Sequence, residues 1–172
     1  MKQEKSKISV LMSVYKKENP EYLRASLESI LVQTRTADEI LLIEDGPLTQ
    51  ELYQVVAEYQ KKCDYLHVHA MEQNVQLGRA LAKGVELCQY DLIARMDTDD
   101  IAMPHRLEKE GAYMEAHPEV DVVGGAIREF NDEGTIDRVK NMPKTQEEIL
   151  EYVKVRNPLN HMTVMYRKDS IL

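Results

Sequence analysis

Tryptophan is absent from this 172-residue sequence, phenylalanine occurs once, and there are only two cysteines. Cys63 and Cys88 lack the spacing of paired metal ligands, so we expect unpaired structural thiols in a reducing compartment. The sequence also lacks a signal-peptide pattern and any apolar run of the roughly 18 residues that a membrane span takes. These absences argue against a zinc-binding or disulfide-based fold and a membrane-spanning helix, and they predict a cytoplasmic protein.

Basic residues are scarce relative to acidic ones. The chain has 22 Lys and Arg against 30 Asp and Glu, which gives a formal net charge of −8. This balance argues against nucleic acid, and against an anionic membrane, as the main partner. Hydrophobic residues make up 43% of the sequence, enough for a real core, and the length is typical of one domain.

Strand and helix patterns alternate along the chain without internal repeats. The predicted strands are Ile8–Val14, Glu39–Ile43, Leu66–Ala70, Asp91–Met96, Val120–Ala126 and Met162–Tyr166, with a hairpin over Ile127–Val139 that turns at Asn131–Gly134. The predicted helices begin at Asn19-Pro20 and then cover Leu48–Lys61, Arg79–Cys88, Pro104–His117 and Thr145–Val155. This order predicts an α/β protein with a mainly parallel central sheet and helices on both faces.

One stretch, Ile93–Asp100, reads as a buried strand that ends in a cluster of acids. Asp97 and Asp99 are two residues apart, so on a strand their side chains would point the same way. Carboxylates about 4 Å apart repel each other by ~4 kcal/mol near a protein surface. A divalent cation such as Mg²⁺ or Mn²⁺ would offset this repulsion, whereas the alternative interpretation is a solvated acidic turn.

Polar and aromatic residues follow several of the predicted strands. They are Ser13-Val14-Tyr15 after the first strand, Glu44-Asp45-Gly46 after the second, the loop Asn74–Gly78 with Arg79 after the third, and Asp97-Thr98-Asp99 after the fourth. In open parallel sheets ligands bind beyond the carboxyl ends of the strands. The pattern therefore favours a ligand site with a metal at this edge over a solvated turn.

Four side chains in or near these segments each allow two interpretations. Tyr15 can stack on a nucleobase or sit on the rim with its hydroxyl in water. Asp45 can accept a hydrogen bond from a base N–H or simply belong to a turn. Arg79 can meet a phosphate near a helix start or be a solvated surface residue. Arg95 either neutralises a neighbouring acid or belongs to the second face of the sheet.

Several blocks of the sequence together resemble a known family. They are Val10–Tyr15, Glu39–Gly46, Asn74–Gly84, Ile93–Asp100, His117–Val120, Gly124-Gly125 and Asn160-His161 with Arg167-Lys168. In this order the chain resembles the family-two nucleotide-sugar glycosyltransferases with the GT-A fold, in the branch that builds bacterial capsule and other surface polysaccharides. A lone Asp-x-Asp is a weak signal, but these blocks in register span nearly the whole chain.

The resemblance implies an inverting transferase that uses a nucleoside-diphosphate sugar, with a UDP-sugar favoured, and Mn²⁺ or Mg²⁺. In such enzymes the second acid of the Asp-x-Asp motif, here Asp99, binds the metal, and the first, Asp97, contacts the ribose or adjoining sugar. The other positions carried over are Ser13, Val14 and Tyr15 for the nucleoside pocket, Asp45 for the base, Arg79 for the nucleotide and His161 for the acceptor side. Gln76 stands where the family often has Gly, so contacts expected from its loop are affected.

The family's catalytic base lies in a Glu-Asp pair that would fall beyond Leu172. We therefore expect residues 1–172 to be one nucleotide-sugar-binding domain, incomplete on its acceptor and catalytic-base side, with little or no transfer activity. The acceptor implied by the resemblance is a saccharide or lipid-linked saccharide, so a full-length protein would work at the inner face of the membrane. An unpaired strand edge, for instance at Met162–Tyr166, would favour a homo-oligomer.

Three other functions fit parts of the pattern. A sugar nucleotidyltransferase uses a related sheet but carries a glycine-rich phosphate loop after its first strand, and Tyr15–Pro20 has no glycine. A non-catalytic phospho-receiver needs acids at the end of the first strand, which here ends in Ser-Val-Tyr. A non-catalytic nucleotide-binding fragment remains the third alternative.

Overall fold

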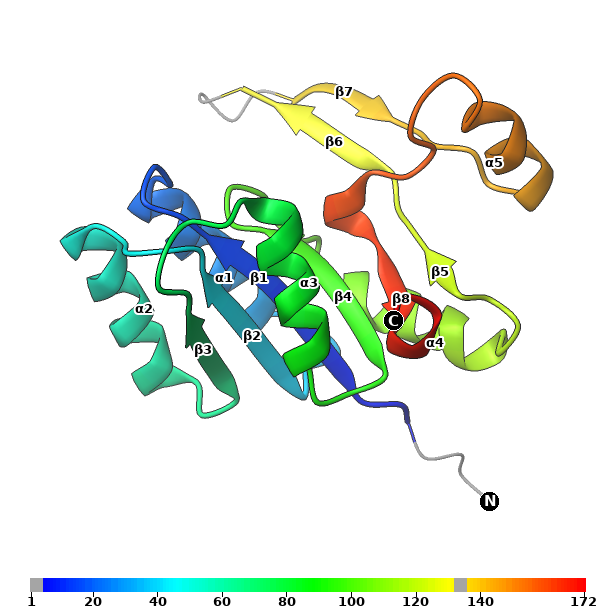
Figure 1. Cartoon of the computed structure of the whole chain (residues 1–172). Helices are drawn as coiled ribbons and strands as arrows, with labels where there is room; N and C mark the ends of the chain where they lie inside the picture. The colour runs from blue at the N-terminus through cyan, green and yellow to red at the C-terminus, as the bar shows by residue number, and fades with distance from the viewer. Residues whose placement is uncertain (1–4, 132–135) are drawn as a thin grey trace.

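The computed structural model describes residues 5–131 and 136–172, which form two sheets (Figure 1). The six-stranded sheet has the order β3-β2-β1-β4-β8-β5, and β6 pairs with β7 in a separate hairpin. The strands are β1 (Ile8–Val14), β2 (Glu39–Glu44), β3 (Leu66–Ala70), β4 (Leu92–Asp97), β5 (Val122–Val123), β6 (Ile127–Phe130), β7 (Ile136–Lys140) and β8 (Met165–Arg167). The helices are α1 (Pro20–Leu31), α2 (Gln50–Lys62), α3 (Leu77–Leu87), α4 (Arg106–Ala116) and α5 (Gln146–Tyr152), with 3₁₀ turns η1 (His161–Thr163) and η2 (Lys168–Ser170).

The centre of the large sheet is parallel. β1 lies between β2 and β4 and runs parallel to both, and β3 runs parallel to β2. Only β8 runs antiparallel, to β4 on one side and to β5 on the other. The predicted α/β fold with a mainly parallel sheet is thus confirmed.

Both faces of the sheet are covered, as the apolar runs predict. Alternate residues of β1 and β4 pack with α1, α2 and α4 on one face, in a cluster that includes Val10, Leu27 and Leu107. The opposite face packs with α3 through a smaller cluster that includes Leu11, Ile93 and Ala80. Because β4 is buried on both faces, side chains at its carboxyl end are held by a rigid support.

The helix starts follow the capping signals of the sequence. The Asn19 side chain accepts a hydrogen bond from the Glu21 N–H, and Pro20 occupies the first turn of α1. Thr145 and Glu148 form the predicted capping box of α5. The start of α3 differs from the prediction, because the helix begins at Leu77 and so includes part of the expected loop Asn74–Gly78.

The predicted strand Val120–Ala126 is too long. Only Val122 and Val123 pair with β8, because the chain then leaves the ladder at Gly124. Side chains replace the ladder there: the Gly125 N–H donates to Thr163 Oγ1 at 2.9 Å, and Asn160 Nδ2 donates to the Gly125 carbonyl at 3.4 Å.

The predicted strand Met162–Tyr166 is shifted and is not a sheet edge. The Thr163 N–H donates to the Asn160 carbonyl at 2.8 Å, which forms the turn η1 and delays β8 to Met165. β8 then lies between β4 and β5, so the edges of this sheet are β3 and β5. The proposed basis for self-association at Met162–Tyr166 was therefore wrong.

The hairpin of β6 and β7 is antiparallel as predicted, and residues 132–134 of its expected turn lie outside the described residues. The hairpin and α5 extend away from the large sheet (Figure 1).

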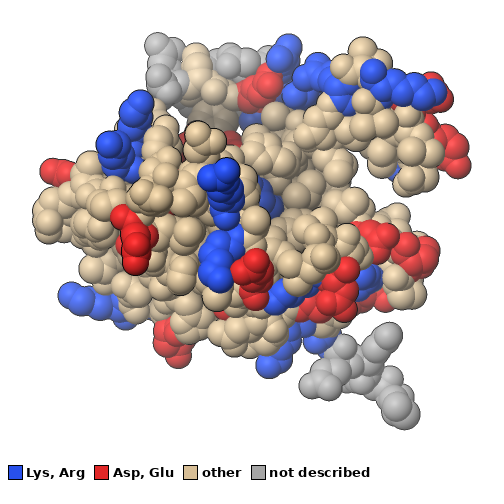
Figure 2. Space-filling model, viewed as in Figure 1, with Lys and Arg blue, Asp and Glu red and all other residues tan. Residues whose placement is uncertain are grey.

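Within the described ranges, no helix is long and apolar enough to cross a bilayer. Figure 2 shows one face of the molecule, on which basic side chains are interspersed with acidic and uncharged ones.

Candidate functional site

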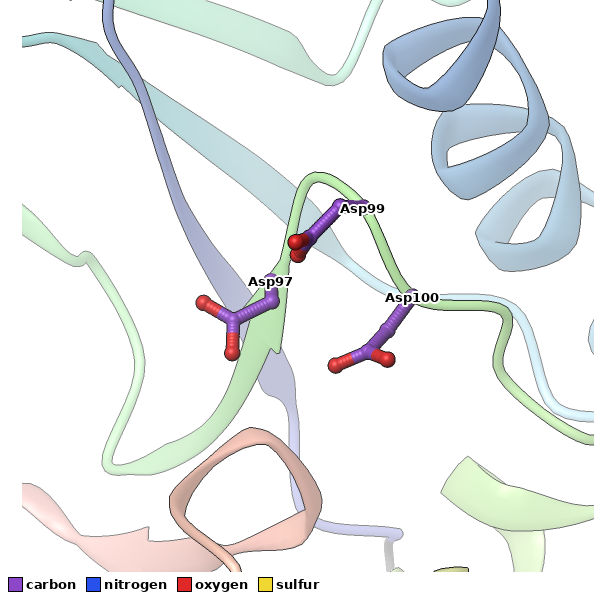
Figure 3. Close-up of side chains that lie close together, drawn as sticks. All are labelled: Asp97, Asp99 and Asp100. Carbon is purple, nitrogen blue, oxygen red and sulfur yellow. The ribbon is translucent and has the colours of Figure 1, made fainter. Parts of the chain in front are cut away.

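Three acids meet where β4 ends. Asp97 is the last residue of β4, and Asp99 and Asp100 lie on the turn that follows, with their carboxylates directed toward a common space (Figure 3). One oxygen from each lies within 4.8 Å of the others. Asp99 is exposed, whereas Asp97 and Asp100 are half-buried. The predicted convergence of Asp97 and Asp99 is thus present, and Asp100 joins them.

The cluster is electrostatically strained. Burial and the neighbouring charges of Asp97 and Asp99 raise the pKa of Asp100 to about 6, against the opposing effects of Arg95 and Arg106. The repulsion among the acids is therefore offset only in part by these two arginines. A divalent cation among the three carboxylates would remove the remaining excess of negative charge.

Two side chains that can carry a positive charge lie next to Asp97. Arg95, two residues earlier on the same face of β4, pairs through Nη2 with Asp97 Oδ1. His161 Nε2 lies 3.7 Å from Asp97 Oδ2 and is about half exposed. Both interpretations of Arg95 hold, since it pairs with a neighbouring acid and also lies level with Leu11 on the second face of the sheet. His161, expected on the acceptor side, lies directly beside this acid.

The acidic turn is fastened to the first helix. Thr98 Oγ1 donates to Glu18 Oε2, and Glu18 also accepts from the Asn19 N–H through its other oxygen at 2.8 Å. Ser26 Oγ donates to the Asp97 carbonyl at 2.8 Å. These two contacts of Glu18 and Ser26 could not be predicted, because they join segments that are about 70 to 80 residues apart in the chain.

The end of β1 contributes two of its three predicted residues to this edge. Ser13 is level with Asp97 in the β1–β4 register, and its carbonyl oxygen lies 3.4 Å from Thr98 Oγ1. Tyr15 follows on the same face of the chain and is 44% exposed, so its ring is free to meet a ligand. Val14 differs, because its side chain is fully buried in the core shared with α1 and α2.

Asp45 anchors the loop that follows β3. Its carboxylate accepts from Asn74 Nδ2 at 2.9 Å and from the Val75 N–H at 2.6 Å. Asp45 is buried, and these two hydrogen bonds engage both of its carboxylate oxygens within the protein. A carboxylate oxygen has a second lone pair, so a role toward a ligand remains open to it beside this anchoring role.

The loop leads directly into α3, whose first turn carries Arg79. Arg79 is exposed and has no side-chain partner among the described residues. It stands close to the free N–H groups at the start of α3, which favour anions. The residue before the helix, Gln76, has φ +72° and ψ +152°, a conformation that is essentially restricted to glycine.

Replacing Gln76 with glycine should stabilise the protein. Relief of the backbone strain, about 1–3 kcal/mol, exceeds the roughly 0.5–1 kcal/mol that glycine loses by entropy. We expect a net gain of about 1 kcal/mol, or a Tm higher by about 2–4 °C for a chain of this length. Thermal unfolding would measure it, with Gln73→Gly, in the same loop but without positive φ, expected to lower the Tm.

The chemistry of the acid cluster fits a hard divalent cation. The three closest donors are carboxylate oxygens, which Mg²⁺ and Mn²⁺ prefer over the nitrogen and sulfur ligands typical of zinc. Two of the acids are half-buried and one is exposed, which leaves an open side for a ligand's own oxygens. The residues present therefore suit a cation that a phosphate-containing ligand would share.

Sequence comparison decides the family. The profile of the family described as "Glycosyl transferase family 2" matches residues 9–171. The chain belongs to glycosyl transferase family 2. This membership sets the phospho-receiver interpretation aside, and it places the acid cluster in a family of sugar-transferring enzymes.

The curated relatives of this family 2 chain include named bacterial glycosyltransferases. The amylovoran biosynthesis glycosyltransferase AmsE of Erwinia amylovora is 44% identical over 164 residues, which cover 95% of this chain and 61% of AmsE. An Escherichia coli UDP-Gal:alpha-D-GlcNAc-diphosphoundecaprenol beta-1,3-galactosyltransferase is 34% identical over 178 residues, which cover 100% of this chain and 62% of that protein. The chain thus spans about three fifths of the length of these curated relatives.

Solved structures agree on the fold of this family 2 chain. S. aureus TarS in complex with UDP-GlcNAc matches it with a TM-score of 0.72 at 21% identity, over 94% of this chain and 45% of the TarS chain. At this level of identity the match establishes the GT-A fold, and the GT-A prediction is confirmed.

Proposed function

We propose that this chain forms the donor site of an inverting glycosyltransferase that binds a nucleoside-diphosphate sugar, with a UDP-sugar favoured, together with Mn²⁺ or Mg²⁺. The observation that carries the proposal is the meeting of three carboxylates at the carboxyl end of β4, level with Ser13 of β1. The comparisons support the choice of donor, since the E. coli relative is named for UDP-Gal and the TarS structure contains UDP-GlcNAc.

In this proposal the acids have separate tasks. Asp99, the exposed acid, is the principal metal ligand, and Asp100 is close enough to assist it. When bound there, the metal would act as a Lewis acid toward the leaving diphosphate. Asp97, which Arg95 already pairs with, contacts the ribose or the adjoining sugar.

The other side chains bind and orient the nucleotide. Tyr15 stacks on the base, a contact worth ~1–3 kcal/mol, and Ser13 lines the same pocket. Asp45 receives the base N–H on a remaining lone pair while it holds the loop at Asn74. Arg79, without a partner among the described side chains, meets the diphosphate beside the start of α3.

The acceptor in this proposal is a saccharide or a lipid-linked saccharide. The name of the E. coli relative, which specifies a diphosphoundecaprenol-linked sugar, supports that choice of acceptor. His161, beside Asp97 and about half exposed, faces the acceptor side of the donor. None of the residues assigned here is the catalytic base, so donor binding is the activity that this proposal assigns to them.

Titration calorimetry with UDP, GDP and ADP, in Mn²⁺ and in EDTA, tests the proposal. UDP should bind in Mn²⁺ at least roughly ten-fold more tightly than in EDTA, a difference of about 1.4 kcal/mol. GDP and ADP should bind more weakly than UDP. Failure of every nucleoside diphosphate to bind in Mn²⁺ would contradict the proposal, and release of pyrophosphate from a nucleoside triphosphate would favour the nucleotidyltransferase alternative.

A further inference from the structure

Arg95 is a buried arginine with unused hydrogen-bonding capacity. Its side chain is about 4% exposed, and its Nη2 pairs with Asp97. Its Nε and Nη1 have no hydrogen-bond partner within the described part of the chain. Leaving a buried donor unpaired destabilises the folded state, and more so when the group is charged. Packing alone therefore does not explain why an arginine occupies this buried position.

The apolar side chains around Arg95 do not account for its charge, which acts on the acids at the end of β4. It lies level with Leu11 of β1, on the face of the sheet whose cluster also contains Ile93 and Tyr166. An apolar side chain of similar volume in such a place is often neutral or stabilising. Its one side-chain partner among the described residues is Asp97, a member of the acid cluster.

Arg95 is also the permanent partner of that carboxylate. His161, the other cation-capable neighbour of Asp97, is about half exposed, lies 3.7 Å away and is charged only when protonated. A guanidinium stays protonated at any ordinary pH and makes directional hydrogen bonds to carboxylates. The side chain of Asp97 is therefore held from the buried side by a fixed charge.

We propose that Arg95 is a positioning residue for the donor site: it fixes the rotamer and charge of Asp97 and thereby sets donor affinity without touching the donor. This inference rests on the proposed function, since it assigns to Asp97 a contact with the nucleotide sugar. In metal sites, residues that hold a ligating or contacting carboxylate in place matter nearly as much as the carboxylate itself. Arg95 acts in the same way, through Asp97.

A double-mutant cycle tests the inference, with binding of UDP in Mn²⁺ as the readout. Arg95→Met should weaken binding by roughly 10- to 100-fold, the usual effect of losing such a supporting residue. Arg95→Lys, which keeps the charge, should recover part of the loss. In an Asp97→Asn background Arg95→Met should have almost no further effect, because the group through which Arg95 acts is already changed. An equal loss in both backgrounds, or wild-type affinity in Arg95→Met, would overturn the inference.

Arg35 provides the matched control. It is another arginine with a largely buried side chain, paired with Glu115 at 2.8 Å and bonded to the Ser6 carbonyl at the amino end of the sheet. Arg35→Met should lower the Tm but leave UDP affinity unchanged. If Arg95→Met does not fold, the cycle with Arg95→Lys and Asp97→Asn replaces it.

A second readout separates this inference from the proposed function. Absence of UDP binding to the wild-type chain would count against the proposed function alone. The same variants compared by thermal unfolding test the pairing itself: Asp97→Asn should shift the Tm less in the Arg95→Met background than in the wild type. Equal shifts in the two backgrounds would show that Arg95 does not act through Asp97.

Discussion

Replacing Asp99 with alanine should abolish Mn²⁺-dependent UDP binding and, at the same time, make the metal-free protein more stable. The loss follows because Asp99 is the exposed member of a set of three carboxylates whose oxygens lie within 4.8 Å of one another. The gain follows because Asp97 and Asp100 lose a neighbour of like charge. We expect affinity in Mn²⁺ to fall to the level measured in EDTA, a loss of at least roughly ten-fold or about 1.4 kcal/mol.

Two measurements check the two halves of this prediction. Calorimetry in Mn²⁺ gives the loss of UDP affinity, and thermal unfolding in EDTA gives the gain in stability of the metal-free protein. Asp64→Ala is the control, since Asp64 is an exposed acid in the turn before β3, away from the cluster. It should change neither quantity appreciably. Retention of Mn²⁺-dependent binding in Asp99→Ala would show that the cation is held elsewhere.

Opposite effects of one substitution on stability and binding are expected at such a site. Functional sites keep groups that the folded protein alone would not favour, and their removal commonly stabilises the fold. Two features of this chain reflect such strain: the raised pKa of Asp100 and the Arg95 nitrogens that lack a hydrogen-bond partner among the described residues. Both lie at the carboxyl end of β4, which is where the sequence places its densest group of acids.

Much of the fold could be predicted because local signals and tertiary structure agree. The buried runs of β1, β2 and β4 and the cap residues Asn19 and Thr145 each point to the element that forms there. The region after β4 was harder to predict. β5 is short because side chains of Asn160 and Thr163 bond to Gly125, contacts between segments far apart in the sequence. β8 is displaced because the Thr163 N–H bonds to the Asn160 carbonyl in the turn η1.

The candidate site was predictable in its position more than in its internal contacts. Topology brings the ends of β1, β2 and β4 together, so Tyr15, Asp45 and Asp97 were identifiable from the sequence. Spacing alone could not show that Asp45 is tied to Asn74 within the protein. The importance of Arg95 could not be predicted either. Among the described residues its Nε and Nη1 lack a hydrogen-bond partner, and this depends on which side chains surround β4 on the α3 face.

Gly46→Ala should cost several kcal/mol of stability and should weaken nucleotide binding. Gly46 has φ +83°, where an alanine would be strained by about 1–2 kcal/mol. An added Cβ would also lie 2.5 Å from the Asn74 backbone nitrogen and 2.9 Å from the Gln73 carbonyl carbon. These are backbone atoms that cannot rotate away. We expect a total loss of about 2–4 kcal/mol, which corresponds to a fall in Tm of roughly 4–16 °C.

The effect on binding follows from the contacts of the displaced segment. Moving Asn74 away from Gly46 pulls its side chain from the Asp45 carboxylate and shifts the start of α3, where Arg79 stands. UDP affinity in Mn²⁺, measured well below the lowered Tm, should therefore fall as well.

Gly78→Ala is the matched control for Gly46→Ala. Gly78 lies in the first turn of α3, and nothing lies within 4 Å of its added Cβ, so alanine should stabilise the helix by up to about 1 kcal/mol. A fall in Tm for Gly78→Ala similar to that for Gly46→Ala would mean that the region tolerates no substitution at all. A Gly46→Ala variant with unchanged stability would show that the loop at Asn74 moves freely, and that Asp45 does not hold it.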